Sequence, residues 1–270
     1  MPPASTTGNL NLSALRIRDA SQGPHHDALI VYLKERTLKM LRNDLIQRNP
    51  MGFFGDKSER SLAGGEFGGI LARAGVGKTA LIVQLAINAM LKDQRVLHIS
   101  LTDPVNKVNL WYQEVYRHLT RNDDATFARA LWEELLPCRF IMTFKAEGFK
   151  LPVLEERLGD LGEQGIFSPS IVIFDGYPFD AAELNSLAAL KTFCADNDMS
   201  AWFTIRTHRH EAPAAGGLPT QLNGLDDLFD ALVRLQPEGK EIHIEILKGV
   251  DAPPSLVLDP TTMLIANEGS

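Results

Sequence analysis

The chain has only two cysteines among its 270 residues, Cys138 and Cys194, and their spacing is not that of metal ligands. We therefore expect two buried thiols in a reducing compartment, not a disulfide framework or a cysteine metal site. No stretch approaches the roughly 20 consecutive apolar residues that cross a bilayer. The first residues lack a basic start followed by an apolar run, so no signal peptide is expected. These absences favour a cytoplasmic protein that does not enter a membrane.

An excess of basic residues is also lacking, because the net charge is −7. Binding nucleic acid over the whole surface would need the opposite balance. The segment 207–224 is long and rich in Gly and Pro, which is often a mark of function. Arg209 is its only Lys or Arg, so DNA binding by this segment is disfavoured but stays open. The aromatic set Trp111, Tyr112 and Tyr116 is interpreted as core or interface and not as a platform for bases.

Composition divides the chain into three parts. Residues 1–26 are rich in Ser, Thr, Asn, Pro and Gly, and are predicted to be a flexible arm. Residues 27–60 are predicted to contain a helix over 27–49 and a linker, and residues 61–270 the main domain. The helix is expected to pack on the core or on a neighbouring subunit, with a membrane-surface helix as the alternative. Its predicted apolar face consists of Ile30, Leu33, Leu38, Leu41 and Leu45.

Strand and helix patterns alternate through the main domain. Apolar runs typical of buried strands lie at 67–72, 95–101, 139–144, 170–175 and 200–206. Helical patterns lie between them at 79–91, 105–119, 125–136, 151–162 and 181–197. This alternation predicts an α/β domain whose mainly parallel sheet is flanked by helices on both faces. Three closely spaced runs then predict antiparallel strands added at one edge, beginning with a hairpin, at 230–235, 240–247 and 255–259.

The segment ARAGVGKT, residues 72–79, has the pattern of a phosphate-binding loop between a strand and a helix. Gly75 and Gly77 permit positive φ and close approach of the backbone to phosphates. The N–H groups of the loop and the helix N-terminus attract an anion. Lys78 is expected to bind the β- and γ-phosphates and Thr79 to ligate magnesium. The predicted nucleotide contacts are Ala74, Gly75, Val76, Gly77, Lys78, Thr79 and Ala80. The full pattern has Gly where this chain has Ala72.

A second acidic position completes the predicted site. Four apolar residues lead to Asp175, which ends a predicted buried strand. Ligands of such sheets bind at the carboxyl ends of the strands. A carboxylate there can hold magnesium through water, so Thr79 and Asp175 are the predicted metal-binding residues.

With these motifs in order, residues 62–250 resemble the RecA-like P-loop ATPases. The resemblance is strongest to the branch with KaiC-type clock ATPases, RadA-type recombination factors and replicative hexameric helicases. It is carried by the segments LAGGEFGGILARAGVGKTALIVQLA, VLHISLTD and DALVRLQPEGKEIHIEILKG. It implies a RecA-like P-loop NTPase fold, ATP and Mg²⁺ as ligands, and a homo-oligomer or a protein partner.

The family places a glutamate after the second strand as the general base, and here Thr102 and Asp103 stand at those positions. Asp103 is the candidate base, but its side chain is one methylene shorter, which favours slow turnover. The alternative is that Thr102, Asp103 and Pro104 only cap the following helix.

The family also places a polar γ-phosphate sensor after the strand at 200–206. The candidates are Arg206, Thr207 and His208, with Thr207 and His208 preferred, and the alternative is a solvated strand end. A Lys-x-Arg pair in the family reaches the site of the neighbouring subunit. Lys248 matches its lysine or is a solvated strand-end charge, but position 250 is valine. An arginine finger contributes several powers of ten in rate, so its loss also favours slow turnover.

Two functions stay open on this evidence. The first is a protein that binds MgATP and hydrolyses it slowly, coupling nucleotide state to assembly or partner binding. Its candidate catalytic residues are Lys78, Asp103, Thr207, His208 and Lys248. The second is a regulatory or interaction protein that depends on bound nucleotide but does not hydrolyse it.

Overall fold

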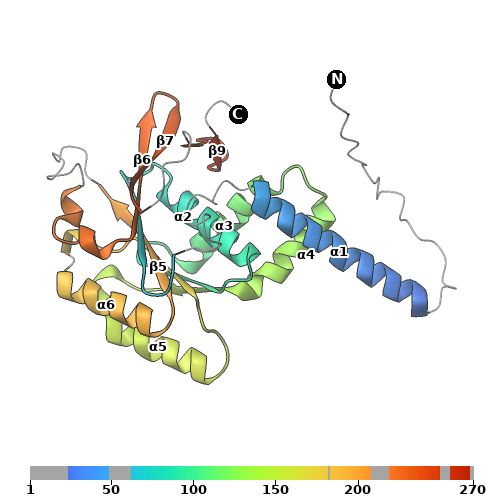
Figure 1. Cartoon of the computed structure of the whole chain (residues 1–270), viewed down its shortest axis with the longest axis horizontal. Helices are drawn as coiled ribbons and strands as arrows, with labels where there is room; N and C mark the ends of the chain where they lie inside the picture. The colour runs from blue at the N-terminus through green and yellow to red at the C-terminus, as the bar shows by residue number, and fades with distance from the viewer. Residues whose placement is uncertain (1–23, 49–61, 182, 208–218, 250–255, 268–270) are drawn as a thin grey trace.

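The computed structural model of the chain describes five stretches, residues 24–48, 62–181, 183–207, 219–249 and 256–267. These stretches form one nine-stranded sheet with helices on both of its faces (Figure 1). The α/β class, the mainly parallel sheet and the C-terminal antiparallel hairpin are confirmed. Most of the predicted arm and linker, residues 1–23 and 49–61, lies outside the described residues.

The sheet has the order β3-β2-β4-β5-β1-β6-β7-β8-β9. Its parallel strands are β1 (Phe67–Ala72), β2 (Val96–Ser100), β3 (Arg139–Thr143), β4 (Ile171–Asp175), β5 (Ser200–Arg206) and β6 (Ala231–Glu238). Antiparallel strands β7 (Glu241–Lys248), β8 (Leu256–Leu258) and β9 (Ile265–Asn267) extend the edge beyond β6. The sequence did not predict β9, because three residues are too few to show a strand period.

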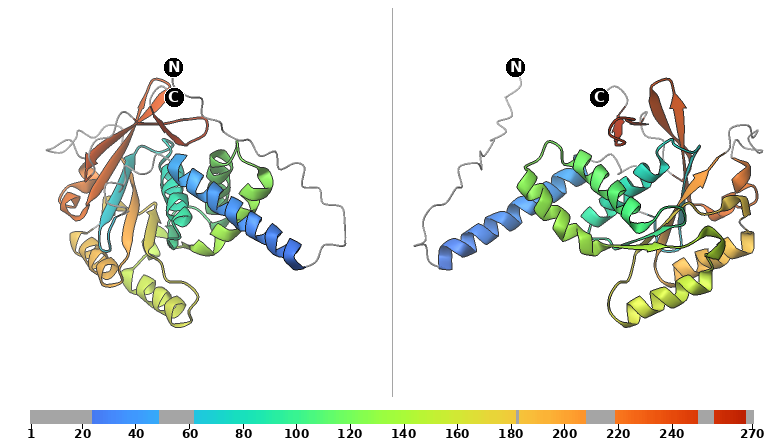
Figure 2. Two further views of the ribbon diagram at one scale, coloured as in Figure 1. Left: turned by 45° about the vertical axis from the view of Figure 1, so that its right-hand side comes forward. Right: turned by 180° about the vertical axis from the view of Figure 1, so that it is seen from behind.

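Helices form a layer on each face of the sheet, as Figure 2 shows. The first layer contains α1 (Pro24–Arg48), α2 (Lys78–Leu91), α3 (Val105–Leu119) and α4 (Ala125–Leu135), which share one apolar core with the sheet. The second contains α5 (Leu151–Glu163) and α6 (Leu184–Asp196), which pack over a second core. Short 3₁₀ helices connect these elements at Leu136–Cys138, Ala146–Gly148, Phe179–Ala181, Thr220–Leu222 and Asp226–Leu228. Burial on both faces explains the nearly continuous apolar runs of the central strands.

Helix α1 is packed only along its second half. Leu38 and Leu45 are buried in the first core, where α1 contacts α2 and α4. Ile30 is 38% exposed and Leu33 is 44% exposed. The neighbouring apolar side chains Leu29, Val31 and Tyr32 are exposed as well. The expected packing on the core is therefore confirmed for Leu38 and Leu45 but not for Ile30 and Leu33, and the alternative of packing on a neighbouring subunit stays a prediction for these two residues. The reason for their exposure is visible in Figure 1, where the N-terminal end of α1 reaches beyond α4 and has no described element against it.

The cysteines and the aromatic residues of α3 lie mostly in the interior. Cys194 is a buried free thiol as predicted, but Cys138 is only half-buried. Tyr112 and Tyr116 are buried in the first core, and Trp111 packs against it, which confirms the core interpretation of these aromatic residues. Across the described stretches, none of the helices combines the length and apolar character that crossing a membrane requires.

Candidate functional site

The loop between β1 and α2 has the backbone shape that its glycines predict. Gly75 has φ 78° and Gly77 has φ 105°, both in the left-handed region that side chains with a Cβ disfavour. Gly77 is the N-cap of α2, and the first helical hydrogen bond runs from Leu81 N to Gly77 O. The N–H groups of residues 78–80, which precede Leu81, thus have no partner within the helix. A loop of this shape at a helix N-terminus attracts anions.

Lys78 places its ammonium over the first residues of this loop. Its Nζ donates to Ala72 O at 2.7 Å and to Arg73 O at 2.9 Å. Burial lowers the pKa of Lys78 to about 8, with Arg206 lowering it further and Asp175 opposing the change. Both present partners are neutral carbonyls, and an anion is a stronger partner for an ammonium group. Lys78 is therefore suited to exchange these carbonyls for a phosphate.

Asp175 ends β4 next to the loop and is only 5% exposed. One carboxylate oxygen accepts a hydrogen bond from Thr79 Oγ1 at 3.1 Å, and the other accepts one from Thr204 Oγ1 at 2.7 Å. Thr204 Oγ1 in turn accepts from Gly176 N at 2.8 Å. Burial raises the pKa of Asp175, while the two threonine hydroxyls and Lys78 oppose the rise. The structure thus brings together Thr79 and Asp175, the two residues predicted to hold a metal.

The oxygen atoms of Thr79 and Asp175 suit magnesium in type but not in number. Hydroxyl and carboxylate oxygens are the hard ligands that Mg²⁺ takes. No group of three or more His, Cys, Asp or Glu that could hold a metal occurs among the described residues. Magnesium typically uses one or two protein ligands and completes its shell with water and phosphate oxygens. The pair therefore fits a magnesium ion that arrives together with a phosphate, and not a cage built by the protein alone.

Asp103 lies between β2 and α3 and is held by an ion pair. Its carboxylate accepts from Lys107 Nζ at 2.8 Å, and its backbone N donates to Ser100 Oγ at 2.9 Å. Helix α3 has Pro104 as its N-cap and receives no side-chain capping bond. The alternative that Thr102, Asp103 and Pro104 cap this helix is thus met only by Pro104, because the Asp103 carboxylate turns to Lys107 instead of capping a backbone N–H. Asp103 also lies near enough to Asp175 to raise the pKa of that carboxyl group.

The end of β5 contributes two residues that sequence reasoning ranked low or missed. Strand alternation places Trp202, Thr204 and Arg206 on the face that carries α2, because Trp202 belongs to the first core. Arg206 is exposed and pairs in register with Ala72, and its charge lowers the pKa of Lys78. Thr204 bonds Asp175, as described above. Thr204 could have been found from the sequence, because it is a polar residue near the end of an otherwise apolar strand.

The remaining predicted residues differ in position. Thr207 is half-buried beside the loop, where its backbone N donates to Ala72 O at 3.1 Å. His208 and position 250 lie outside the described residues. Lys248 ends β7, and its Nζ donates to Asp226 O at 3.0 Å. This position does not test a role of Lys248 in a neighbouring subunit.

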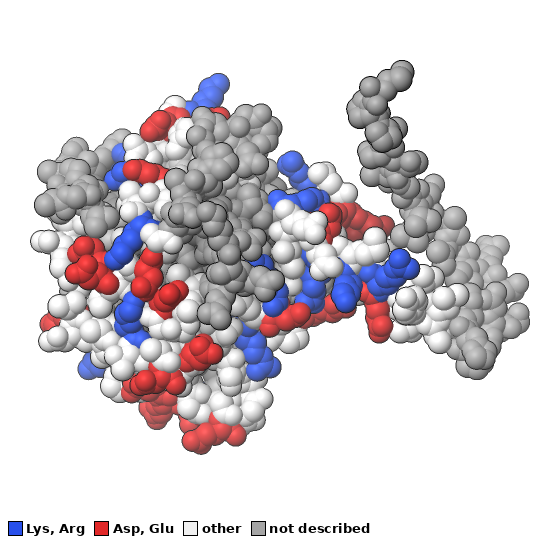
Figure 3. Space-filling view, in the orientation of Figure 1, with Lys and Arg blue, Asp and Glu red and all other residues white. Residues whose placement is uncertain are grey.

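The charge distribution offers no evident platform for nucleic acid on the face drawn in Figure 3. Basic and acidic side chains are interspersed over the described part of this face. Acidic side chains gather over α5, which exposes Glu155, Glu156, Asp160 and Glu163. Phosphate backbones require several clustered Lys or Arg.

Comparison with known proteins assigns the chain to no family. No protein-family model matches the chain, and a search of curated proteins finds no match. The resemblance to RecA-like ATPases thus rests on the motifs and their order, and the function must be inferred from the residues of the site.

Proposed function

We propose that the chain binds ATP with magnesium in a RecA-like P-loop site. The observation that carries this proposal is the meeting of Lys78, Thr79 and Asp175 at a loop with two positive-φ glycines. Asp175 lies 96 residues after Thr79 in the sequence, yet their oxygen atoms are 3.1 Å apart. An ammonium group, a hydroxyl and a carboxylate beside a helix N-terminus form a suitable site for magnesium and a polyphosphate.

Each residue has a distinct role in this proposal. The N–H groups of residues 74–80 and the Lys78 ammonium bind the phosphates. Thr79 ligates the magnesium ion directly, and Asp175 holds it through water. The ion neutralises phosphate charge when bound. Thr204 keeps the Asp175 carboxylate oriented through its 2.7 Å hydrogen bond. Adenine is inferred only from the family resemblance.

We propose that hydrolysis is slow and that nucleotide state governs assembly or partner binding. Asp103 is the general base in this scheme, with Thr207 as a γ-phosphate sensor and Lys248 acting toward a neighbouring copy. The Asp103 carboxylate accepts a hydrogen bond from the Lys107 ammonium at 2.8 Å, so one of its oxygens is already engaged and less available to orient an attacking water. That same ion pair favours the alternative of a regulatory protein that binds nucleotide without hydrolysing it.

The decisive experiment measures ATP binding and phosphate release by the same protein preparations. Wild-type protein should bind MgATP, and Lys78→Ala should abolish binding. Lys92→Ala is the matched control, because Lys92 is an exposed lysine at the other end of α2. Asp103→Ala should keep binding but lose phosphate release.

The possible outcomes separate the two candidate functions. Binding without release by wild-type protein would establish the regulatory alternative. Phosphate release that survives Asp103→Ala would remove Asp103 from the base role. If wild-type protein binds no nucleotide, or if Lys78→Ala binds as well as Lys92→Ala, the P-loop assignment is wrong.

A further inference from the structure

The turn between β8 and β9, residues 259–264, packs against one side of the phosphate loop. A Cβ added to Gly77 would lie 2.7 Å from Leu258 Cδ2 and 3.5 Å from Met263 Sδ. Val76, Met263 and Leu264 all pack on the first apolar core. The end of β8 and the turn that follows it therefore leave no room for a larger side chain at Gly77, although nearly the whole domain separates them from the loop in sequence.

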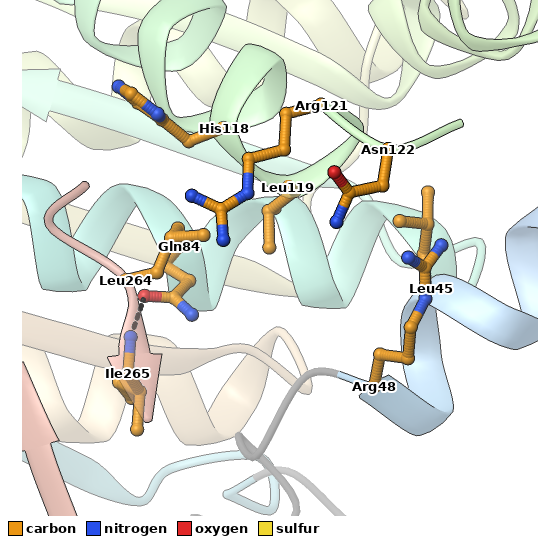
Figure 4. A pocket seen from close by; sticks show the side chains of 9 residues that line it. All are labelled: Leu45, Arg48, Gln84, His118, Leu119, Arg121, Asn122, Leu264 and Ile265. Carbon is orange, nitrogen blue, oxygen red and sulfur yellow. Dashed lines mark hydrogen bonds between the residues drawn. The ribbon is translucent and has the colours of Figure 1, made fainter. Parts of the chain in front are cut away.

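The turn is also attached to helix α2. Ile265 N donates to Gln84 Oε1 at 3.1 Å, and Figure 4 draws this hydrogen bond between β9 and α2. Gln84 is completely buried, so the bond forms away from competing water. Because Gln84 lies on the helix that begins at the phosphate loop, this bond fixes the position of the turn relative to that loop.

Met263 is held in a conformation that a methionine rarely adopts. Its φ is 56°, in the left-handed region. Its backbone N donates to Asp259 O at 2.7 Å, and the Asp259 carboxylate accepts from Thr261 N and Thr262 Oγ1. Such strained residues persist only where their surroundings hold them, and they concentrate at ligand-binding positions. The turn uses these polar groups internally and turns the Met263 thioether toward the loop.

The strand order indicates where the nucleoside of a bound nucleotide would lie. Strand β1 leads into the loop, and β5 and β4, with Asp175, lie on one side of it. Thr79 and Asp175 therefore mark the magnesium side, toward which the terminal phosphates lie. Strands β6, β7 and β8 lie on the other side of β1. The rest of a nucleotide whose terminal phosphates lie at Thr79 and Asp175 would extend toward that side, which is the side of Met263.

We propose that the 259–264 turn is the nucleoside-contacting wall of the site and that Met263 packs its thioether against the base. This inference rests on the proposed nucleotide function. A thioether makes favourable contacts with aromatic rings, so the ligand class is a nucleotide with an aromatic base and not a free polyphosphate. Met263 is thus a specificity residue for the nucleoside, distinct from the residues that bind phosphate.

The test compares a ligand that has a base with one that lacks it, namely ADP and inorganic pyrophosphate, by calorimetric titration. Met263→Ala should weaken ADP binding about two- to twelvefold, the range expected for one lost sulfur–aromatic contact. Pyrophosphate binding should not change. Met263→Leu should recover part of the ADP affinity. Met40→Ala is the matched control, since Met40 lies on α1 and is 62% exposed.

The results that would overturn the inference differ from those that would overturn the nucleotide site. Equal weakening of ADP and pyrophosphate would mean that the turn only shapes the loop. Unchanged ADP binding in Met263→Ala would exclude contact with the base. If wild-type protein binds neither ligand, the proposed function itself fails. If Met263→Ala unfolds, Met263→Gln has a side chain of similar length and serves as the test variant under the same criteria.

Discussion

Raising the pH from 7 to 9 should weaken nucleotide binding about tenfold through the deprotonation of Lys78. Its pKa is about 8 in the folded protein, lowered chiefly by burial. About ten in eleven molecules then carry the ammonium at pH 7 and about one in eleven at pH 9. Because apparent affinity scales with the fraction of competent protein, the ratio of these fractions is the expected loss.

The assay is a titration with ADP and magnesium at intervals from pH 7 to pH 9.5. Phosphate groups are about nine-tenths ionised at pH 7 and almost completely ionised above pH 8, since their second pKa is about 6, so their titration changes binding little and in the opposite direction. Lys78→Arg is the control, because a guanidinium group stays charged at every pH in the series. That variant should bind with a lower but nearly constant affinity. A flat profile for wild-type protein, or an equal slope for Lys78→Arg, would refute the reasoning.

The same pKa has the opposite effect on folding in the absence of nucleotide. The pKa of Lys78 falls from 10.5 to about 8 on folding, so the unfolded chain binds more protons between these values. The free energy of unfolding of wild-type protein should therefore rise with pH across this window relative to Lys78→Arg. Denaturant titrations of the two proteins at pH 8 and pH 10 measure this difference, and a relative fall would contradict the assignment.

Three further predictions concern neighbouring positions. Asp175→Asn should abolish the enhancement of ATP affinity by magnesium, because a neutral amide holds the ion poorly; titrations with and without magnesium test this, and an undiminished enhancement would contradict it. Arg206→Gln should move the midpoint of the pH profile upward, because the Arg206 charge lowers the pKa of Lys78; an unchanged midpoint would exclude that coupling. Leu45→Ala should lower the free energy of unfolding by about 2–5 kcal/mol, because Leu45 is 2% exposed in the core. Leu33→Ala, at an exposed position of the same helix, should change it by less than about 0.5 kcal/mol, and equal losses in denaturant titrations would contradict the packing of α1.

The accuracy of the sequence-based predictions depended on how local each signal was. Strand β5 was predicted at its observed bounds, 200–206, and helix α3 at 105–119, because both carry a clear period. The strand β9 was missed because its three residues form only through pairing with β8. The apolar residues of α1 were predicted to share one face that packs on the core or on a neighbouring subunit, because a helical period shows which residues share a face. A helical period cannot show that α1 extends beyond α4, which leaves the apolar residues of its first half without a neighbouring helix in the described part of the chain.

The backbone of the loop between β1 and α2 is the part that the sequence by itself determined. The positive φ of Gly75 and Gly77 and the start of α2 at Lys78 follow from residue types at adjacent positions, where backbone sterics act. Only the tertiary structure decided what surrounds this loop. Strand order and register bring Thr79 to Asp175 and place the Thr204 hydroxyl on the same carboxylate. They also bring Met263 close to Gly77. Strand order and register are set by the burial of apolar surface over the whole sheet, and no local sequence pattern can predict them.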